Sequence, residues 1–134
     1  MHYSYSKAKA PLILSQLLYS PELLTLVRNI IHKKIKKIDA ELFSFSWRDY
    51  TILHDDLQEK DGIDLIIDLT DDWVEPCGGS IVYVDGTGTY HTIPPKENQL
   101  IFAKREQDIQ QFIQYINHLC KHKTRYLLIA NIVI

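Results

Sequence analysis

The sequence predicts a mostly β fold, a sandwich or barrel-like roll of short strands braced by one N-terminal helix. A single stretch, Pro21–Ile38, has apolar residues at helical spacing. From about residue 42 onward the chain breaks into short apolar segments of strand length, two of them separated by a tight-turn signal. At 134 residues the chain is expected to form a single domain, residues 1–134, with the helical brace at about 20–38 and the β-roll at about 42–134.

The helix prediction depends on a start signal and an apolar stripe. Ser20-Pro21-Glu22 combines an N-cap residue, a proline at the first helical position and an acid in the first turn. The apolar stripe that follows consists of Leu23, Val27, Ile30, Ile31, Ile35 and Ile38. The opposite face carries Arg28, Lys33, Lys36 and Lys37. We interpret these cations as a solvated face near the end of the helix, and a docking patch for a partner or for nucleic acid is the alternative.

Short extended segments follow the helix. Asp85-Gly86-Thr87-Gly88, between Ser80–Val84 and Thr89–Ile93, is a strong signal of a β-hairpin. Gln107–Asn117 fits neither period cleanly and could form a helix instead of a strand. The other expected strands are Leu42–Trp47, Asp49–Leu53, Ile63–Leu69, Leu100–Phe102, Phe112–Ile116 and Tyr126–Ile134.

The composition is that of an ordinary soluble protein, 46% hydrophobic and 24% charged, with a formal net charge of −2. No overall basic field favours nucleic acid or an anionic membrane as a partner. No apolar run reaches membrane-spanning length. The two cysteines, Cys77 and Cys120, make neither a disulfide framework nor a metal-type pair, so we expect reduced thiols and a cytoplasmic protein.

His54 and Asp56 are candidate metal ligands. If Tyr50–Asp56 is extended, as its β-branched and aromatic content favours, the two side chains leave the same face of the strand, whereas Asp55 faces the other way. An imidazole beside a carboxylate supplies two of the three groups that hold non-haem Fe(II) and leaves positions open for substrates. Taken alone, the pair is more readily explained as the polar end of a surface strand.

Further motifs follow His54 and Asp56 in a recognisable order: Leu69-Thr70-Asp71-Asp72-Trp73, Gly78-Gly79-Ser80, Ile93-Pro94-Pro95-Lys96-Glu97-Asn98-Gln99-Leu100-Ile101-Phe102, and Arg125. With the segment Asp49–Asp56, they resemble the Fe(II)/2-oxoglutarate oxygenases, in particular the prolyl-4-hydroxylase-like branch. The resemblance covers most of the chain from Asp49 onward. It implies a double-stranded β-helix, a jelly-roll or cupin-like fold, in agreement with the strand pattern.

The resemblance also implies an activity. The chain would be a dioxygenase that uses Fe(II) and 2-oxoglutarate to hydroxylate a protein side chain, a small molecule or a modified base. We expect no membrane partner, and a nucleic-acid partner is not favoured. His54 and Asp56 would hold the iron. Arg125 would bind the far carboxylate of 2-oxoglutarate, because its planar guanidinium can donate two hydrogen bonds. Tyr50 would contribute to the same co-substrate site.

The third iron ligand departs from the family pattern. A histidine is expected on a late strand before the basic residue, and the cleanest register places Gln111 there, a poor ligand for Fe(II). His118 is the histidine that we assign to the site, whereas His91 lies on the wrong strand of the pattern. The alternative to an active dioxygenase is a degenerate, non-catalytic binding module that keeps the double-stranded β-helix and has lost a complete iron triad.

Overall fold

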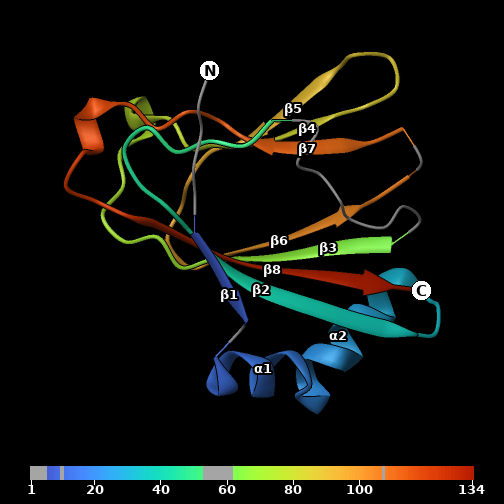
Figure 1. Cartoon of the computed structure of the whole chain (residues 1–134). Helices are drawn as coiled ribbons and strands as arrows, with labels where there is room; N and C mark the ends of the chain where they lie inside the picture. The colour runs from blue at the N-terminus through green and yellow to red at the C-terminus, as the bar shows by residue number, and fades with distance from the viewer. Residues whose placement is uncertain (1–5, 10, 53–61, 107) are drawn as a thin grey trace.

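The computed structural model describes residues 6–9, 11–52, 62–106 and 108–134. Two antiparallel β-sheets pack face to face, and two helices cover the outer face of the larger one (Figure 1). The five-stranded sheet has the order β1 (Ser6–Lys9), β2 (Lys37–Phe45), β8 (Arg125–Val133), β3 (Gly62–Asp68) and β6 (Gln99–Lys104). The three-stranded sheet has the order β5 (Tyr90–Ile93), β4 (Ile81–Val84) and β7 (Gln110–Ile113). The predicted fold class, mostly β with helical structure at the N-terminus, is confirmed.

The chain winds between the two sheets. After β3 it crosses to the small sheet for β4 and β5, returns for β6, crosses again for β7 and returns for β8. This winding makes the roll a double-stranded β-helix. The last strand, β8, lies between β2 and β3, in a register that sets Arg125 opposite Phe45 and Leu127 opposite Asp68. The start of β8 and the end of β3 are therefore neighbours, although they are far apart in the sequence.

Two apolar clusters hold the layers together. One lies between the sheets and includes Ile66, Ile81 and Leu127. The other lies between the large sheet and the helices and includes Leu18, Val27, Leu65 and Leu128. Because neighbouring residues of a strand face opposite sides, β3 contributes to both clusters, and its sequence is an almost continuous apolar run. The same alternation turns the two buried aspartates of β3, Asp64 and Asp68, toward the space between the sheets with Ile66.

The N-terminal helical structure differs from the prediction. There are two helices, α1 (Leu12–Leu18) and α2 (Pro21–Ile31), and Ser20 caps α2 by accepting a hydrogen bond from the backbone N–H of Leu23 at 3.3 Å. The predicted helix Pro21–Ile38 is too long, because His32 adopts a left-handed conformation with φ of 53° and ends it. Ile35 and Ile38 still pack on the cluster that holds Val27, which explains why they extend the apolar stripe. Neither helix is long and apolar enough to cross a membrane in the described ranges.

Most of the strands predicted for the β-roll are confirmed, but the predicted strand Asp49–Leu53 is wrong in its described part, where residues 49–52 form no strand. The β4–β5 turn closes through the N–H of Asp85, which donates to the carbonyl oxygen of Thr89 at 3.1 Å, and the Asp85 carboxylate accepts from the N–H groups of Thr87 and Thr89. The helical alternative for Gln107–Asn117 is wrong in the described part, because Gln110–Ile113 forms β7.

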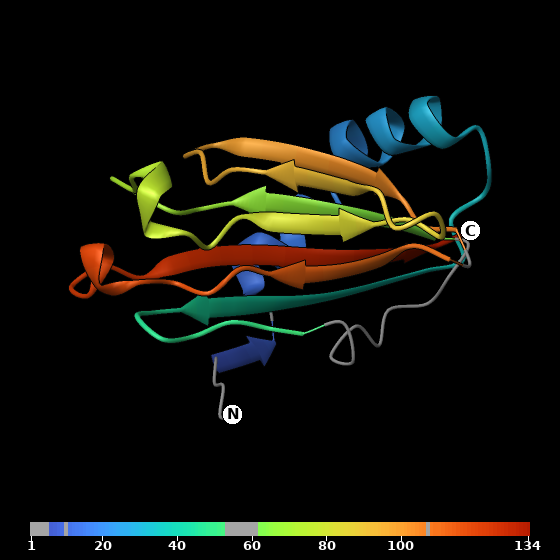
Figure 2. The ribbon, with the colours of Figure 1, turned by 90° about the horizontal axis from the view of Figure 1, so that it is seen from above.

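The two cysteines are joined, which corrects the expectation of free thiols. Cys77 ends the 3-10 helix η2 (Glu75–Cys77), Cys120 ends the 3-10 helix η3 (His118–Cys120), and the two form a disulfide. Both short helices lie at one end of the roll, away from the C-terminus (Figure 2). The fold brings together cysteines that are 43 residues apart. Disulfides are most common in oxidising compartments, so this bond removes the argument from reduced thiols for a cytoplasmic protein. The cytoplasmic location stays a prediction.

Candidate functional site

Arg125 lies at the centre of the predicted co-substrate site and is completely buried between the two sheets. Its Nη1 donates to the Asp68 carboxylate at 2.8 Å and to the Thr70 hydroxyl at 2.9 Å. Its Nε donates to the carbonyl oxygen of Gly79 at 2.6 Å. Burial lowers the pKa of the Arg125 guanidinium, and the charge of Asp68 opposes this effect. The guanidinium and the Asp68 carboxylate therefore form an internal ion pair shielded from solvent.

Asp68 is held in place from several sides. Its carboxylate also accepts hydrogen bonds from the backbone N–H groups of Thr70 and Lys96, each at 3.0 Å. These contacts tie the end of β3 to the loop before β6. Within the described part of the chain, Nη2 of Arg125 is buried and has no hydrogen-bond partner. Asp68, Thr70 and Gly79 thus accept hydrogen bonds from Nη1 and Nε of the guanidinium, whereas Nη2 has no acceptor among the described residues.

The Asp-Trp and Gly-Gly motifs build the wall around Arg125. The Trp73 indole donates to the carbonyl oxygen of Gly78 at 3.0 Å. Gly78 and Gly79 have φ of 81° and 77°, in the left-handed region that favours glycine. A Cβ on Gly79 would lie 3.1 Å from Cδ of Arg125, and one on Gly78 would collide with the carbonyl oxygen of Tyr115. The backbone approaches Arg125 closely at Gly79 because this position has no side chain.

A second buried polar network lies between the sheets, centred on Asp64 of β3. Arg105 donates to its carboxylate at 2.6 Å, and the Tyr83 hydroxyl donates to the same oxygen at 2.8 Å. Asn131 lies at 3.4 Å from the other carboxylate oxygen. Burial, reinforced by the Asp64 charge, raises the pKa of Tyr83 far above its usual range. Tyr83 is therefore neutral and acts as a hydrogen-bond donor.

Sequence reasoning missed both carboxylates of these networks. The available signal was Asp64 within the apolar run Ile63–Leu69, because an acid in a strand buried on both faces needs a cation. The sequence did not indicate which cation, since Arg105 is 41 residues away and Arg125 is 57 residues from Asp68.

Only one of the three predicted iron ligands, His118, lies in the described residues. His54 and Asp56 lie outside these residues, so their assignment as ligands stays a prediction. His118 is exposed in η3. Gln111, the alternative at the third position, lies in β7 opposite Tyr83. The described residues contain no group of three or more His, Cys, Asp or Glu that could hold a metal.

The described segment 49–52 lies beside β7. The segment 49–52 runs antiparallel to β7, with the N–H of Thr51 donating to Ile113 at 3.1 Å and the N–H of Ile116 donating to Asp49 at 3.1 Å. Ile52 therefore lies nearer to the Gln111 end of β7 than Asp49 does. His118 follows the opposite end of β7, where Figure 2 shows η3 beside η2.

Tyr50, the other predicted co-substrate residue, is half-buried and packs against Tyr115 with ring centroids 5.9 Å apart. It lines an apolar groove on the side of the small sheet together with Ile52, Tyr90 and Phe112. Arg125 is not among the residues that line this groove.

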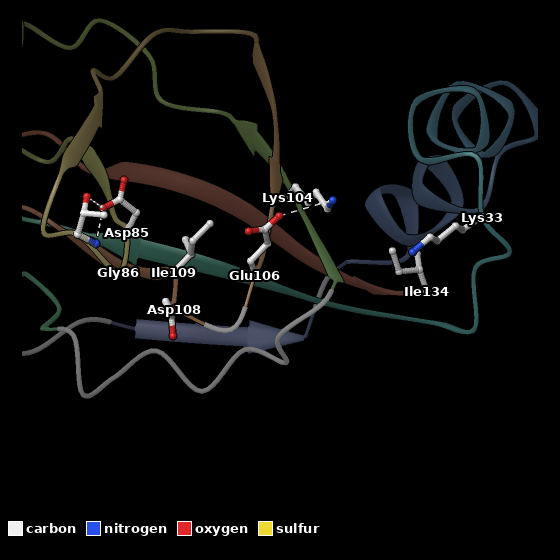
Figure 3. Close-up of a pocket in the computed structure, with 9 residues that line it drawn as sticks. Lys33, Asp85, Gly86, Lys104, Glu106, Asp108, Ile109 and Ile134 are labelled. Carbon is white, nitrogen blue, oxygen red and sulfur yellow. Dashed lines mark hydrogen bonds and ion pairs between the residues drawn. The ribbon is translucent and has the colours of Figure 1, made fainter.

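A polar pocket lies beside the β4–β5 turn (Figure 3). It carries both signs of charge, with Lys104 paired to Glu106 at 3.6 Å. Hydrogen bonds from Thr87 and Thr89 lower the pKa of Asp85, which lines the same pocket. The carboxylates of Asp85 and Glu106 already have partners next to them in the chain. Because lysines line the pocket beside these acids, its charges favour neither an anionic nor a cationic ligand.

The ion pair with Asp68 bears on the expected contact between Arg125 and 2-oxoglutarate, which stays a prediction. The guanidinium that would bind the far carboxylate is already neutralised by Asp68, at 2.8 Å, and is sealed from solvent. The chain supplies its own carboxylate at this position.

Comparison with known proteins identifies the fold. No protein-family model and no curated protein matches the chain. Among solved structures, it matches a Trichoplax adhaerens prolyl hydroxylase in complex with a hypoxia inducible factor oxygen degradation domain peptide, with a TM-score of 0.72 and 12% identity over 98% of this chain and 63% of that one. It thus spans slightly less than two thirds of that enzyme.

Two other matches have similar scores. A Burkholderia pseudomallei oxidoreductase of the 2OG-Fe(II) oxygenase family has a TM-score of 0.69 and 9% identity, over 90% of this chain and 55% of that one. The viral collagen prolyl hydroxylase of Paramecium Bursaria Chlorella virus-1, in its 2OG complex, has a TM-score of 0.66 and 13% identity, over 98% and 80%. The predicted resemblance to the prolyl-4-hydroxylase-like 2-oxoglutarate oxygenases is therefore confirmed at the level of the fold.

Proposed function

We propose that this chain is a non-catalytic binding module built on the fold of the 2-oxoglutarate oxygenases. The observation that carries the proposal is the buried ion pair between Arg125 and Asp68. The one cation that the resemblance assigns to the co-substrate is already engaged by a carboxylate of the chain itself. Gln111 at the expected position of the third iron ligand supports the same conclusion, because an amide is a poor ligand for Fe(II).

Electrostatics explains why this pair opposes co-substrate binding. If 2-oxoglutarate entered beside Asp68, two carboxylates would face one guanidinium in a medium of low dielectric constant, and the excess negative charge would be unfavourable. If it displaced Asp68, that carboxylate would be left buried without its cation. Breaking a buried pair in this way costs about 3–5 kcal/mol. Such a cost weakens binding by roughly two to four orders of magnitude.

The second candidate is an Fe(II)- and 2-oxoglutarate-dependent dioxygenase that acts on a protein side chain or a small molecule. The specific observation in its favour is Nη2 of Arg125, which is buried without a partner in the described part of the chain and could donate to a second carboxylate. In this candidate His54, Asp56 and His118 would hold the iron, and Arg125 and Tyr50 would contact 2-oxoglutarate. Bound iron would supply the oxidative chemistry, and the chain would supply ligation and orientation.

An anaerobic titration with Fe(II) and 2-oxoglutarate distinguishes the two candidates. A ternary complex with both bound has a visible charge-transfer band. The binding module is expected to give no band in the wild type. A band that is present in the wild type and in Gln111→Ala, but absent in His54→Ala and His118→Ala, would overturn the proposal and establish the dioxygenase site.

A further inference from the structure

We propose that the helix pair α1–α2, with the basic segment that follows α2, docks onto an anionic lipid surface. This helical layer covers the outer face of the five-stranded sheet (Figure 1), on the side away from the Arg125 site. The inference goes beyond the proposed function, because it depends on no residue of that interior site. It is carried by two features of the layer, its exposed aliphatic side chains and its local excess of cations.

Each helix buries one apolar ridge and exposes another. In α1, Leu18 is buried against the sheet, whereas Leu12 and Ile13 are 73% and 77% exposed. In α2, Val27 is buried, whereas Leu26 and Ile30 are 43% and 47% exposed. Single exposed apolar residues are common, but several aliphatic side chains on two adjoining helices are typical of an interaction surface. These side chains could enter the boundary between lipid headgroups and acyl chains.

Cations flank this surface at the C-terminal end of α2. The exposed residues Lys33, Lys34 and Lys36 follow this helix. Residues 11–36 contain four Lys or Arg and one Asp or Glu, although the whole chain contains 15 and 17. The chain therefore carries a positive region despite its net charge of −2. Such a region is attracted to anionic lipids within a Debye length of the surface.

The combination favours lipid over other partners. The exposed apolar residues at the helix surface are mainly aliphatic, whereas proteins that bind single-stranded nucleic acid present aromatic rings for base stacking. A second copy of this chain would bring two basic regions together, which is electrostatically unfavourable. Lipid accepts both parts of the surface, because aliphatic side chains enter the apolar region while lysines reach the phosphates.

Vesicle flotation tests the proposal directly. The wild type is expected to float with vesicles of phosphatidylcholine mixed with phosphatidylserine, and not with phosphatidylcholine alone. Added salt should weaken the binding. Ile13→Gln should lower the affinity for the vesicles roughly tenfold or more, because it removes an aliphatic group that the lipid would bury. Replacing Lys33, Lys34 and Lys36 with glutamine should cost roughly fivefold for each lysine.

The matched control is the pair Leu119→Gln and Lys121→Gln in and after η3, where Leu119 is 59% exposed. This control should float like the wild type, and thermal unfolding should confirm that all variants are folded. Absence of flotation with anionic vesicles at low salt, or an equal loss in the control, would overturn the proposal. So would a dimer in sedimentation velocity that Ile13→Gln converts to monomer without any vesicle binding, because the surface would then be a self-association interface.

Discussion

Replacing Asp68 with asparagine is predicted to destabilise the whole domain, because it removes one charge from a fully buried ion pair without changing the shape of the side chain. Arg125 would keep its hydrogen bonds to Thr70 and Gly79 but would lose its only charged partner in the described structure. Leaving a buried charge uncompensated costs about 3–5 kcal/mol. A domain of this size has a total stability of about 5–15 kcal/mol, so the loss is a large fraction of it.

Urea denaturation measures this effect, and the midpoint of thermal unfolding should fall by roughly 10–20 °C. The matched control is Asp72→Asn, the same substitution in the exposed ion pair between Asp72 and Lys123, whose charged atoms lie 3.2 Å apart. That change should cost no more than about 1 kcal/mol. In the double variant Asp68→Asn/Arg125→Gln, the cost should fall short of the sum of the single costs by about 1 kcal/mol or more. The reasoning is refuted if Asp68→Asn costs no more than Asp72→Asn.

Three further predictions concern other parts of the interior. The pKa of Tyr83 is raised by folding, so its contribution to stability is present below its unfolded pKa of about 10 and is lost as the pH rises above that value. Urea midpoints should therefore fall at alkaline pH, and less steeply in Tyr83→Phe. Gly78→Ala should abolish stable folding in circular dichroism, whereas Gly88→Ala, with positive φ but open space around it, should cost only about 1 kcal/mol. Reduction of Cys77–Cys120 should cost about 2–5 kcal/mol in the same assay, and an unchanged midpoint would contradict this.

The parts of the fold that could be predicted from sequence are those with local signals. The turn Asp85-Gly86-Thr87-Gly88 and the apolar strands β3 and β8 were predicted close to their observed bounds. The helix was predicted to extend beyond Ile31 because Ile35 and Ile38 continue the apolar pattern. They do so because they pack on the same cluster as Val27, although they lie outside the helix. The helix α1 was missed because Pro11 at its start makes no side-chain cap.

The site was predictable only in part, because its chemistry depends on contacts between distant residues. Arg125 could be identified from the motifs that precede it. Its engagement by Asp68 depends on the pairing of β3 with β8, which the local sequence does not specify. The disulfide has the same explanation, since Cys77 and Cys120 approach each other only when η2 and η3 meet at one end of the roll.

The most direct test of the central claim, that Asp68 occupies the guanidinium of Arg125 in place of a co-substrate, is calorimetric titration of the wild-type protein with 2-oxoglutarate in the presence of Fe(II) under anaerobic conditions. The account predicts no measurable binding at micromolar to low-millimolar 2-oxoglutarate. Micromolar binding that is lost in Arg125→Gln would contradict it, because the guanidinium would then be available to a second carboxylate.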